Sequence, residues 1–408
     1  METKKLIDCC EFISDGDHLP PPKSDSGVPF ITISNITGQN KLSLEDTMFV
    51  PESYYNGLNE NKKAQKGDIL YSVVGSFGKP VYVDFDKQMV FQRHIAILRP
   101  KRNVNARFIY YTMLNPQFYK LVDKLAIGCS QRTVTLDTLR NIEISLPDKD
   151  IQDKTVEVLS LIDRKIDENC KINDNLEQQA KLIYDYWFTQ FDFPDENGKP
   201  YCSSGGKMVW DEQLKRNIPE NWNVVPLLKL VSWESNSQPP KSEFVYEPKE
   251  GYVRFIQNRD YDSDTHITYI PRTKNLSIVD RFDILMDKYG DAGAVRYGIE
   301  GAFNVALGKI CVHNPNYREY IRSFLGSDGI YKFLHNSCMA STRASLSEAN
   351  LAILNVVVPD EKIILDYENF LQKIRVSILK NKDETVELIN LRDWLLPMLM
   401  NGQATIAD

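Results

Sequence analysis

Two stretches of this chain read almost alike, and such an internal repeat limits the possible folds more than any other feature of the sequence. Residues 67–83 read GDILYSVVGSFGKPVYV, and residues 282–298 read FDILMDKYGDAGAVRYG. Without gaps they share Asp68/Asp283, Ile69/Ile284, Leu70/Leu285, Gly75/Gly290, Gly78/Gly293 and Tyr82/Tyr297. The chain therefore contains the same structural unit twice.

The repeat extends well beyond these two stretches. PPKS occurs at 21–24 and again at 239–242, and the stretch 130–147 parallels 341–359 when small gaps are allowed. A solenoid needs a shorter period and more copies. Two homologous halves, related by an internal pseudo-two-fold repeat, are the better interpretation.

Each half mixes short β-rich runs, such as PVYVDF and HIAILRP in the first and FDILM and GKICVH in the second, with helix-like stretches, and Gly and Pro separate them. This sequence pattern is typical of a compact mixed α/β domain. We therefore expect an α+β protein with one such domain over residues 1–150 and the other over residues 221–359.

A helical tail is expected after each domain, over residues 151–190 and 360–402. In the first tail, heptad a positions hold Leu159, Ile166, Asn173, Ala180 and Trp187, and d positions hold Ile162, Asn169, Leu176 and Ile183. The second tail repeats this register with Leu371, Ile378, Thr385, Arg392 and Leu399 at a, and Ile374, Asn381, Leu388 and Leu395 at d. Matched heptads of this length predict a coiled coil.

The alternative is that each tail packs only on its own domain. A 40-residue helix would be about 60 Å long, which is more than one small domain can cover. We therefore expect the two helices to pair antiparallel and to separate the domains. The Gly-, Pro- and Ser-rich stretch 191–220 reads as the linker into the second half.

No catalytic or metal-binding motif is recognisable. The chain has neither a Walker A nor a Rossmann glycine motif, and its five histidines do not have metal-ligand spacing. Gly75 and Gly78, like Gly290 and Gly293, are better suited to a tight turn than to binding phosphate. A binding function without catalysis is the simplest expectation.

Polar and basic residues cluster beside the repeated landmarks, and Arg, Asn and Gln side chains are suited to reading base edges in the major groove. The candidates in the first half are Ser34, Asn35, Gln92, Arg93, His94, Gln131 and Arg132. Those in the second half are Gln257, Asn258, Arg259, Lys288, Tyr289, Asn304, Thr342 and Arg343. The framework matches between the halves while these residues differ, as expected for a reader of two different short sequences.

The composition of the chain further narrows the class of protein. The net charge of −7 argues against a simple nucleic-acid-coating protein, so contact with phosphate requires local basic patches. No run of 18 apolar residues predicts a membrane span. The seven scattered cysteines, with no C-x-x-C, indicate reduced thiols and a cytoplasmic protein.

The order of these pieces resembles the specificity (S) subunits of type I restriction–modification systems. The resemblance rests on FISDGDHLPPPKSDSGVPFITISNI, on GDILYSVVGSFGKPVYV, on TLRNIEISLPDKDIQDKTVEVLSLIDRKI, on the linker and on the ending LRDWLLPMLMNGQ. It covers nearly the whole chain. The second half departs from it in having FDIL for GDIL and in lacking DGDH.

The resemblance implies two target recognition domains, each reading one half of a bipartite double-stranded DNA site. The paired helices would act as a spacer and dock two modification subunits, which carry S-adenosylmethionine and methylate adenine. Restriction subunits, where present, would use ATP and Mg²⁺. The chain itself would have no cofactor and no catalysis. Two alternatives for this chain are a two-domain protein–protein scaffold and a methyltransferase with a fused recognition domain.

Overall fold

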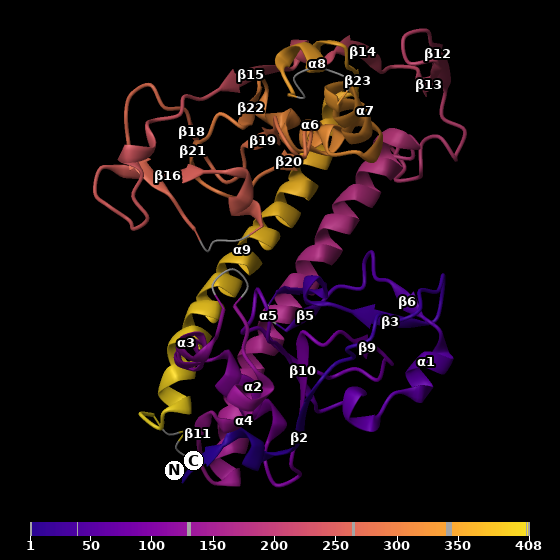
Figure 1. Cartoon of the computed structure of the whole chain (residues 1–408). Coiled ribbons are helices and arrows are strands. Elements are labelled where there is room, and N and C mark those ends of the chain that lie inside the picture. The colour runs from indigo at the N-terminus through magenta and orange to yellow at the C-terminus, as the bar shows by residue number, and fades with distance from the viewer. Residues whose placement is uncertain are drawn as a thin grey trace. The chain divides into compact units, whose positions relative to one another are not determined.

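The computed structural model of the chain describes residues 2–38, 40–128, 132–262, 266–339, 345–404 and 406. Its contacts divide it into two compact units, which are visible in Figure 1. Unit 1 comprises Met1–Glu168 and Glu384–Asp408, and unit 2 comprises Asn169–Asp383. This division differs from the five expected segments because it cuts through both helical tails.

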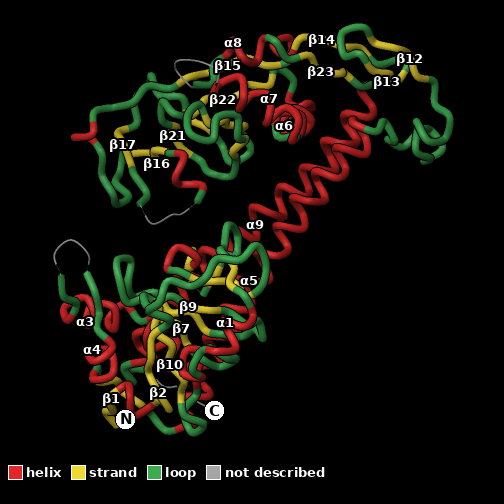
Figure 2. Tube along the Cα trace, turned by 45° about the vertical axis from the view of Figure 1, so that its right-hand side comes forward, coloured by secondary structure: helices red, strands yellow, loops and turns green. Residues whose placement is uncertain are grey.

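The centre of unit 1 is a four-stranded antiparallel sheet in the order β2-β10-β7-β8. Figure 2 labels three of these strands, β2, β10 and β7. Its strands are β2 (Cys10–Asp15), β10 (Ile95–Pro100), β7 (Ile69–Ser72) and β8 (Pro80–Tyr82). All four residues of β7 are buried, so this strand reads as a continuous run rather than an alternating one. The stretch GDILYS of the repeat therefore forms an inner strand.

Smaller elements complete unit 1. A three-stranded sheet joins β6 (Phe49–Val50), β3 (Val28–Ile31) and β9 (Val90–Phe91), and β1 (Glu2–Lys5) pairs with β11 (Glu143–Leu146). The remaining strands are β4 (Ile36–Gly38) and β5 (Lys41–Leu42). The short helices are α1 (Glu52–Gly57), α2 (Ala106–Leu114), α3 (Pro116–Leu125) and α4 (Leu136–Asn141).

Unit 2 repeats this plan. Its main sheet has the order β15-β22-β19-β20, formed by β15 (Val231–Ser235), β22 (Leu307–Val312), β19 (Ile284–Asp287) and β20 (Val295–Arg296). A second sheet joins β17 (Tyr269–Pro271), β16 (Tyr252–Ile256), β21 (Gly301–Phe303) and β18 (Ile278–Val279). The other elements are β12 (Met208–Asp211), β13 (Arg216–Pro219), β14 (Asn223–Pro226), β23 (Asn355–Val358), α6 (Arg318–Leu325), α7 (Asp328–Met339) and α8 (Glu348–Ala352).

The expected long helices are present. The first, α5, spans Lys149–Tyr184 and continues as a π-helical turn over Asp185–Thr189, and the second, α9, spans Glu361–Met400. Each helix begins in one unit and ends in the other. The core of unit 1 accordingly contains both Leu159 of α5 and Leu399 of α9.

The two helices pair antiparallel within each unit. In unit 1, Asp163 of α5 lies 3.1 Å from Arg392 of α9. In unit 2, the amide of Asn381 donates to Asn173 at 2.9 Å, and Glu177 pairs with Arg375. Residue numbers rise along one helix as they fall along the other. The expected fold class, two mixed α/β domains with a pair of long antiparallel helices, is confirmed.

Candidate DNA-recognition surface

One loop of unit 1, the DGDH stretch at residues 15–18, is held against the turn between β9 and β10. The amide of Gly16 donates to Ile95 O at 3.0 Å, and the amide of Asp17 donates to Phe91 O at 2.6 Å. A Cβ atom on Gly16 would lie 2.1 Å from that same carbonyl oxygen. Only glycine therefore allows the loop to approach this closely.

Asp17 fixes the loop from the other side. Its carboxylate accepts hydrogen bonds from Lys62 at 3.0 Å, from the amide of His18 at 2.9 Å and from the hydroxyl of Tyr54. Burial alone would raise the pKa of Asp17, but the hydrogen bonds from Tyr54 and Lys62 hold it below its usual value. The loop is thus positioned by a buried carboxylate that stays ionised.

This anchoring brings Asp15 and His18 beside the expected residues Arg93 and His94. All four line a concavity of about 360 Å³, together with residues 73–74 and 133–136. His18 Nε2 lies 2.6 Å from Asp15 Oδ2. The concavity is therefore lined by four separate segments of the chain, and two of them supply its guanidinium, imidazole and carboxylate groups.

Arg93 is exposed, and its orientation is set by His94. Arg93 Nε donates to His94 Nε2 at 3.3 Å. Burial lowers the pKa of His94, and the charges of Arg93 and His18 lower it further. The imidazole is therefore neutral at pH 7 and can accept this hydrogen bond, which leaves both terminal nitrogens of the Arg93 guanidinium to other partners.

The other candidates of unit 1 are placed less favourably for reading bases. Arg132 forms an ion pair with Asp123 and stacks over the ring of Phe77, and Gln92 is half-buried. Gln131 lies outside the described residues. Arg132 therefore already has a carboxylate partner in the free protein.

Ser34 and Asn35 line a different concavity of unit 1. Ser34 is exposed, but Asn35 is 8% exposed. The amide of Asn35 accepts from Thr32 N at 2.8 Å and donates to Ser43 O and Thr47 Oγ1, both at 3.0 Å. Asn35 therefore shapes this turn, while Ser34 remains open to a ligand.

The corresponding turn of unit 2 contains Gln257, Asn258 and Arg259. Asp260 here takes the role of Asn35, because its carboxylate accepts from Gln257 N at 3.1 Å. Gln257 also donates to Thr268 Oγ1 at 3.0 Å, and Asn258 is half-buried. Arg259 is exposed at the surface of the turn, which leaves it the best placed of the three for contact with DNA.

Lys288 and Tyr289 lie at the tip of the hairpin that joins β19 and β20. The buried carboxylate of Asp287 pairs with Arg296 at 2.8 Å and so fixes the base of the hairpin. Tyr289 is 50% exposed, and Lys288 is half-buried. Asn304 instead caps its own turn by accepting from Ala306 N at 3.1 Å. Thr342 and Arg343 lie outside the described residues.

Backbone hydrogen bonds establish which residues of the two units correspond. The amide of Gln92 donates to Ile31 O at 2.9 Å, and the amide of Asn304 donates to Ile256 O at 3.0 Å. Residues 92–94 therefore correspond to residues 304–306. In the main sheets, Asp15 pairs with Ala96 and Ser235 pairs with Gly308, so these two residues also correspond.

The side chains at these corresponding positions differ. Arg93 and His94 of unit 1 are replaced by Val305 and Ala306 in unit 2, and Asp15 is replaced by Ser235. Val305 is 39% exposed. The two units thus present chemically different groups on the same backbone framework.

The expected seam of the helix pair is buried or half-buried along its whole length. This holds for Leu159, Ile162, Ile166, Asn169, Leu176 and Ile183 of α5. It also holds for Leu371, Ile374, Ile378, Asn381, Leu388 and Leu395 of α9. In unit 2 the seam includes polar contacts, since Asn381 donates to Asn173, which in turn donates to Ile378 O at 3.3 Å.

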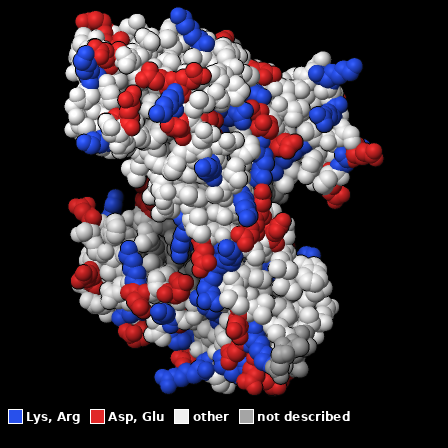
Figure 3. Space-filling model, turned by 180° about the vertical axis from the view of Figure 1, so that it is seen from behind, with Lys and Arg blue, Asp and Glu red and all other residues white. Residues whose placement is uncertain are grey.

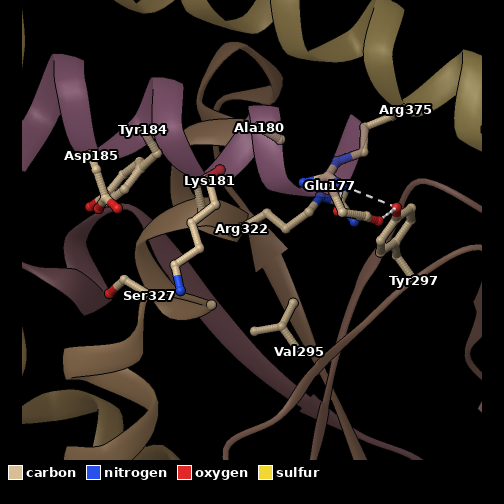
Figure 4. Close-up of a pocket in the computed structure, with 12 residues that line it drawn as sticks. Glu177, Ala180, Lys181, Tyr184, Asp185, Val295, Tyr297, Arg322, Ser327 and Arg375 are labelled. Atoms are coloured by element: carbon tan, nitrogen blue, oxygen red, sulfur yellow. Dashed lines mark hydrogen bonds and ion pairs between the residues drawn. The ribbon is translucent and has the colours of Figure 1, made fainter. Parts of the chain in front are cut away.

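A buried ionic network lies beside this seam in unit 2 (Figure 4). Arg375 of α9 pairs with Glu177 of α5 and, at 2.9 Å, with Glu319 of α6. Tyr297 donates its hydroxyl proton to Glu177, and Arg322 pairs with Glu319 at 3.0 Å. The adjoining cavity of about 280 Å³ is lined by acidic and basic side chains alike, so it carries no single sign of charge.

Two features of the site were not predicted from the sequence. The first is the Asp15–His18 pair, for which the DGDH stretch was the available signal. The second is the Arg375 network, for which no local signal exists because its members come from four distant segments. On the face shown in Figure 3, basic and acidic residues are interspersed rather than gathered into one basic stripe.

Among the described residues, no three His, Cys, Asp or Glu side chains are grouped so as to hold a metal ion. In the same part of the chain, no helix combines the length and the apolar character needed to cross a bilayer.

A repeated α/β framework with different polar loops on each copy defines a two-domain recognition protein. Comparison with known proteins specifies the class. The family described as type I restriction modification DNA specificity domain matches residues 1–178 and 219–393, so the chain belongs to this family and carries its domain twice. The family expected from the sequence is confirmed.

Two curated relatives are type I specificity subunits. The HindI specificity subunit of Haemophilus influenzae is 22% identical over 411 residues, which covers 84% of this chain and 87% of the relative. The MjaIX specificity subunit of Methanocaldococcus jannaschii is 23% identical over 326 residues, with coverage of 76% and 71%. A solved S subunit from M. genitalium has the same fold, with a TM-score of 0.59, 16% identity and coverage of 98% and 96%.

Proposed function

We propose that this chain is the DNA specificity subunit of a type I restriction–modification complex, in which unit 1 and unit 2 each read one half of a bipartite site. One observation carries the proposal. Corresponding loops of the two units share their backbone hydrogen bonds but carry different side chains, such as Arg93 against Val305. That arrangement suits two readers with different base preferences, because side chains supply the direct readout of sequence.

The reaction itself is assigned to partner subunits. Two modification subunits bind S-adenosylmethionine and methylate adenine, and restriction subunits use ATP and Mg²⁺ for cleavage. The specificity subunit then determines only where they act. We infer that the chain acts in the cytoplasm, together with its DNA.

The paired helices serve as the spacer and as a docking surface for the modification subunits. The polar contacts at the half-buried Asn173 and Asn381 support the spacer role, because amides paired across a helix seam fix its register. Both helices of the pair carry exposed apolar side chains in unit 2, including Ile172 at 46%, Leu182 at 66% and Val376 at 49% exposure. Exposed apolar groups of this kind favour a protein partner over DNA.

Transfer of labelled methyl groups tests the assignment. The chain alone, a modification subunit alone and the two together are incubated with genomic DNA and labelled S-adenosylmethionine. We expect methylation at one bipartite sequence only when both proteins are present. Methylation by the chain alone would identify it as a methyltransferase, and absence of both DNA binding and methylation in every mixture would favour a protein scaffold.

A domain exchange tests the separate readout by the two units. Residues 1–150 are replaced by the first domain of another family member, and methylated sites are mapped across a genome. We expect one half of the recognised sequence to change while the other half persists. A change in both halves would reject independent readers.

A further inference from the structure

The concavity of unit 1 around Arg93 and Asp15 has the composition of a base-pair reader rather than of a phosphate site. A phosphate contact requires only cations and amide donors, whereas this concavity places a carboxylate in the same hollow as a guanidinium. A carboxylate repels phosphate oxygens. Its presence therefore indicates a ligand that offers a hydrogen-bond donor as well as acceptors.

Arg93 is prepared to bind two acceptors at once. Its Nε is occupied by the neutral imidazole of His94 at 3.3 Å, so the two terminal nitrogens of the guanidinium are left for other acceptors. Among the described residues, no ion pair joins Arg93 to a carboxylate of the chain. A guanidinium fork of this kind matches the O6 and N7 acceptors of guanine.

Asp15 is prepared to accept a hydrogen bond. His18 holds one carboxylate oxygen at 2.6 Å, and the side chain is still 23% exposed. The loop beneath it cannot move away easily, because Gly16 and Asp17 are hydrogen-bonded to β9 and β10. A positioned carboxylate matches the N4 amino donor of cytosine.

We propose that Arg93 and Asp15 of unit 1 read one G·C base pair in the major groove, with Arg93 on guanine and Asp15 on cytosine. His94 and His18 act as positioning residues for these two groups. The proposal rests on the proposed function and adds to it the identity of a base pair and the residues that select it. It also names Asp15 and His18, which had no role until the structure placed them.

The corresponding residues of unit 2 support the assignment of Arg93 and Asp15, because they differ in chemistry. Its corresponding positions carry Val305, Ala306 and Ser235, which provide neither the guanidinium fork nor the carboxylate. The two units therefore differ in this respect while sharing their framework, and the G·C reading belongs to the half-site of unit 1 alone. Val305 provides a matched control, because it occupies the position of Arg93 on the same turn and is also exposed.

The test uses the chain assembled with its modification subunit and a DNA library with randomised half-sites. Wild type, Arg93→Ala, Asp15→Asn and Val305→Ala are compared by sequencing the methylated products. We expect Arg93→Ala to lose about tenfold to a hundredfold of the preference for G·C at one position. Asp15→Asn should weaken the preference at that same position, and Val305→Ala should leave it unchanged.

The outcomes separate this inference from the function on which it rests. Absence of sequence-specific methylation with the wild type would overturn both. A second outcome would overturn only the base-pair assignment. In it, the wild type methylates specific sites, but Arg93→Ala lowers methylation equally at all of them, as loss of a phosphate contact does. The same conclusion would follow if Arg93→Ala and Asp15→Asn altered different positions, or if Val305→Ala altered the same one.

Discussion

Arg375 is the residue whose removal should damage unit 2 most. The residue is 5% exposed, and its guanidinium connects three elements, because it pairs with Glu177 of α5, with Glu319 of α6 and, at 3.0 Å, with the hydroxyl of Tyr297. Burial alone would raise the pKa of Glu177, but the charge of Arg375 and the hydrogen bond from Tyr297 lower it. The substitution Arg375→Met keeps most of the side-chain volume and removes the charge.

The size of the effect follows from the partners left behind. Removing one member of a buried ion pair costs about 3–5 kcal/mol, because the remaining charge loses its compensation. Glu319 retains Arg322 at 3.0 Å, and the side chain of Glu177 is 43% exposed, so solvent relieves part of the loss. We therefore expect the lower end of the range, a loss of about 3 kcal/mol from the free energy of unfolding of unit 2.

Urea denaturation combined with hydrogen exchange measures this loss. Exchange is read separately for peptides of unit 1 and unit 2, because two units need not unfold together. Lys373→Met is the matched control, since Lys373 lies two residues earlier on α9 and is exposed. Arg375→Met should increase exchange over the first half of α9 and the second half of α5, while the control leaves both unchanged.

An equal loss of stability in Arg375→Met and Lys373→Met would refute a stabilising role for this network. Failure of Glu177→Gln to restore stability in the Arg375→Met background would refute it too, because the uncompensated carboxylate is then not the source of the loss. A double-mutant cycle on these two positions gives the coupling energy directly.

Three further outcomes are expected. Burial raises the pKa of Glu368 to about 7 from its ordinary value of 4.5, so the stability it contributes is complete below pH 4.5 and is lost as the pH rises to about 7. Glu368→Gln should therefore raise the free energy of unfolding at pH 8 by about 1 kcal/mol after allowance for solvent screening, and an unchanged pH profile would contradict this. Gly16→Ala should destabilise unit 1 in thermal melting and impair reading of its half-site in the methylation assay. Gly57→Ala is the control and should do neither, because its added Cβ meets nothing within 4 Å. Asn381→Leu removes the donor to Asn173 and should lower the urea midpoint of unit 2, and Leu at both positions should restore it; a lower midpoint for the double variant would refute this view of the seam.

Much of this protein is determined by the sequence alone. The duplication of GDIL and FDIL, the heptads of the two tails and the glycines at the turns are local or periodic signals. A strand, a helix or a turn depends mainly on residues close in sequence, so their existence could be predicted. The same reasoning predicted the antiparallel helix pair, because two matched amphipathic helices in one chain must each bury an apolar stripe.

Only the tertiary structure decided which residues act together. Asp15 and Arg93 come to one concavity because the amides of Gly16 and Asp17 bond to strands some 80 residues away. Glu177, Glu319 and Arg375 meet because helices from three segments pack on one core. Asn35, which the sequence suggested as a base reader, instead uses its amide to hold its own turn. Such outcomes depend on long-range packing, in which each polar group takes the partner that burial leaves within reach, and no local pattern encodes that choice.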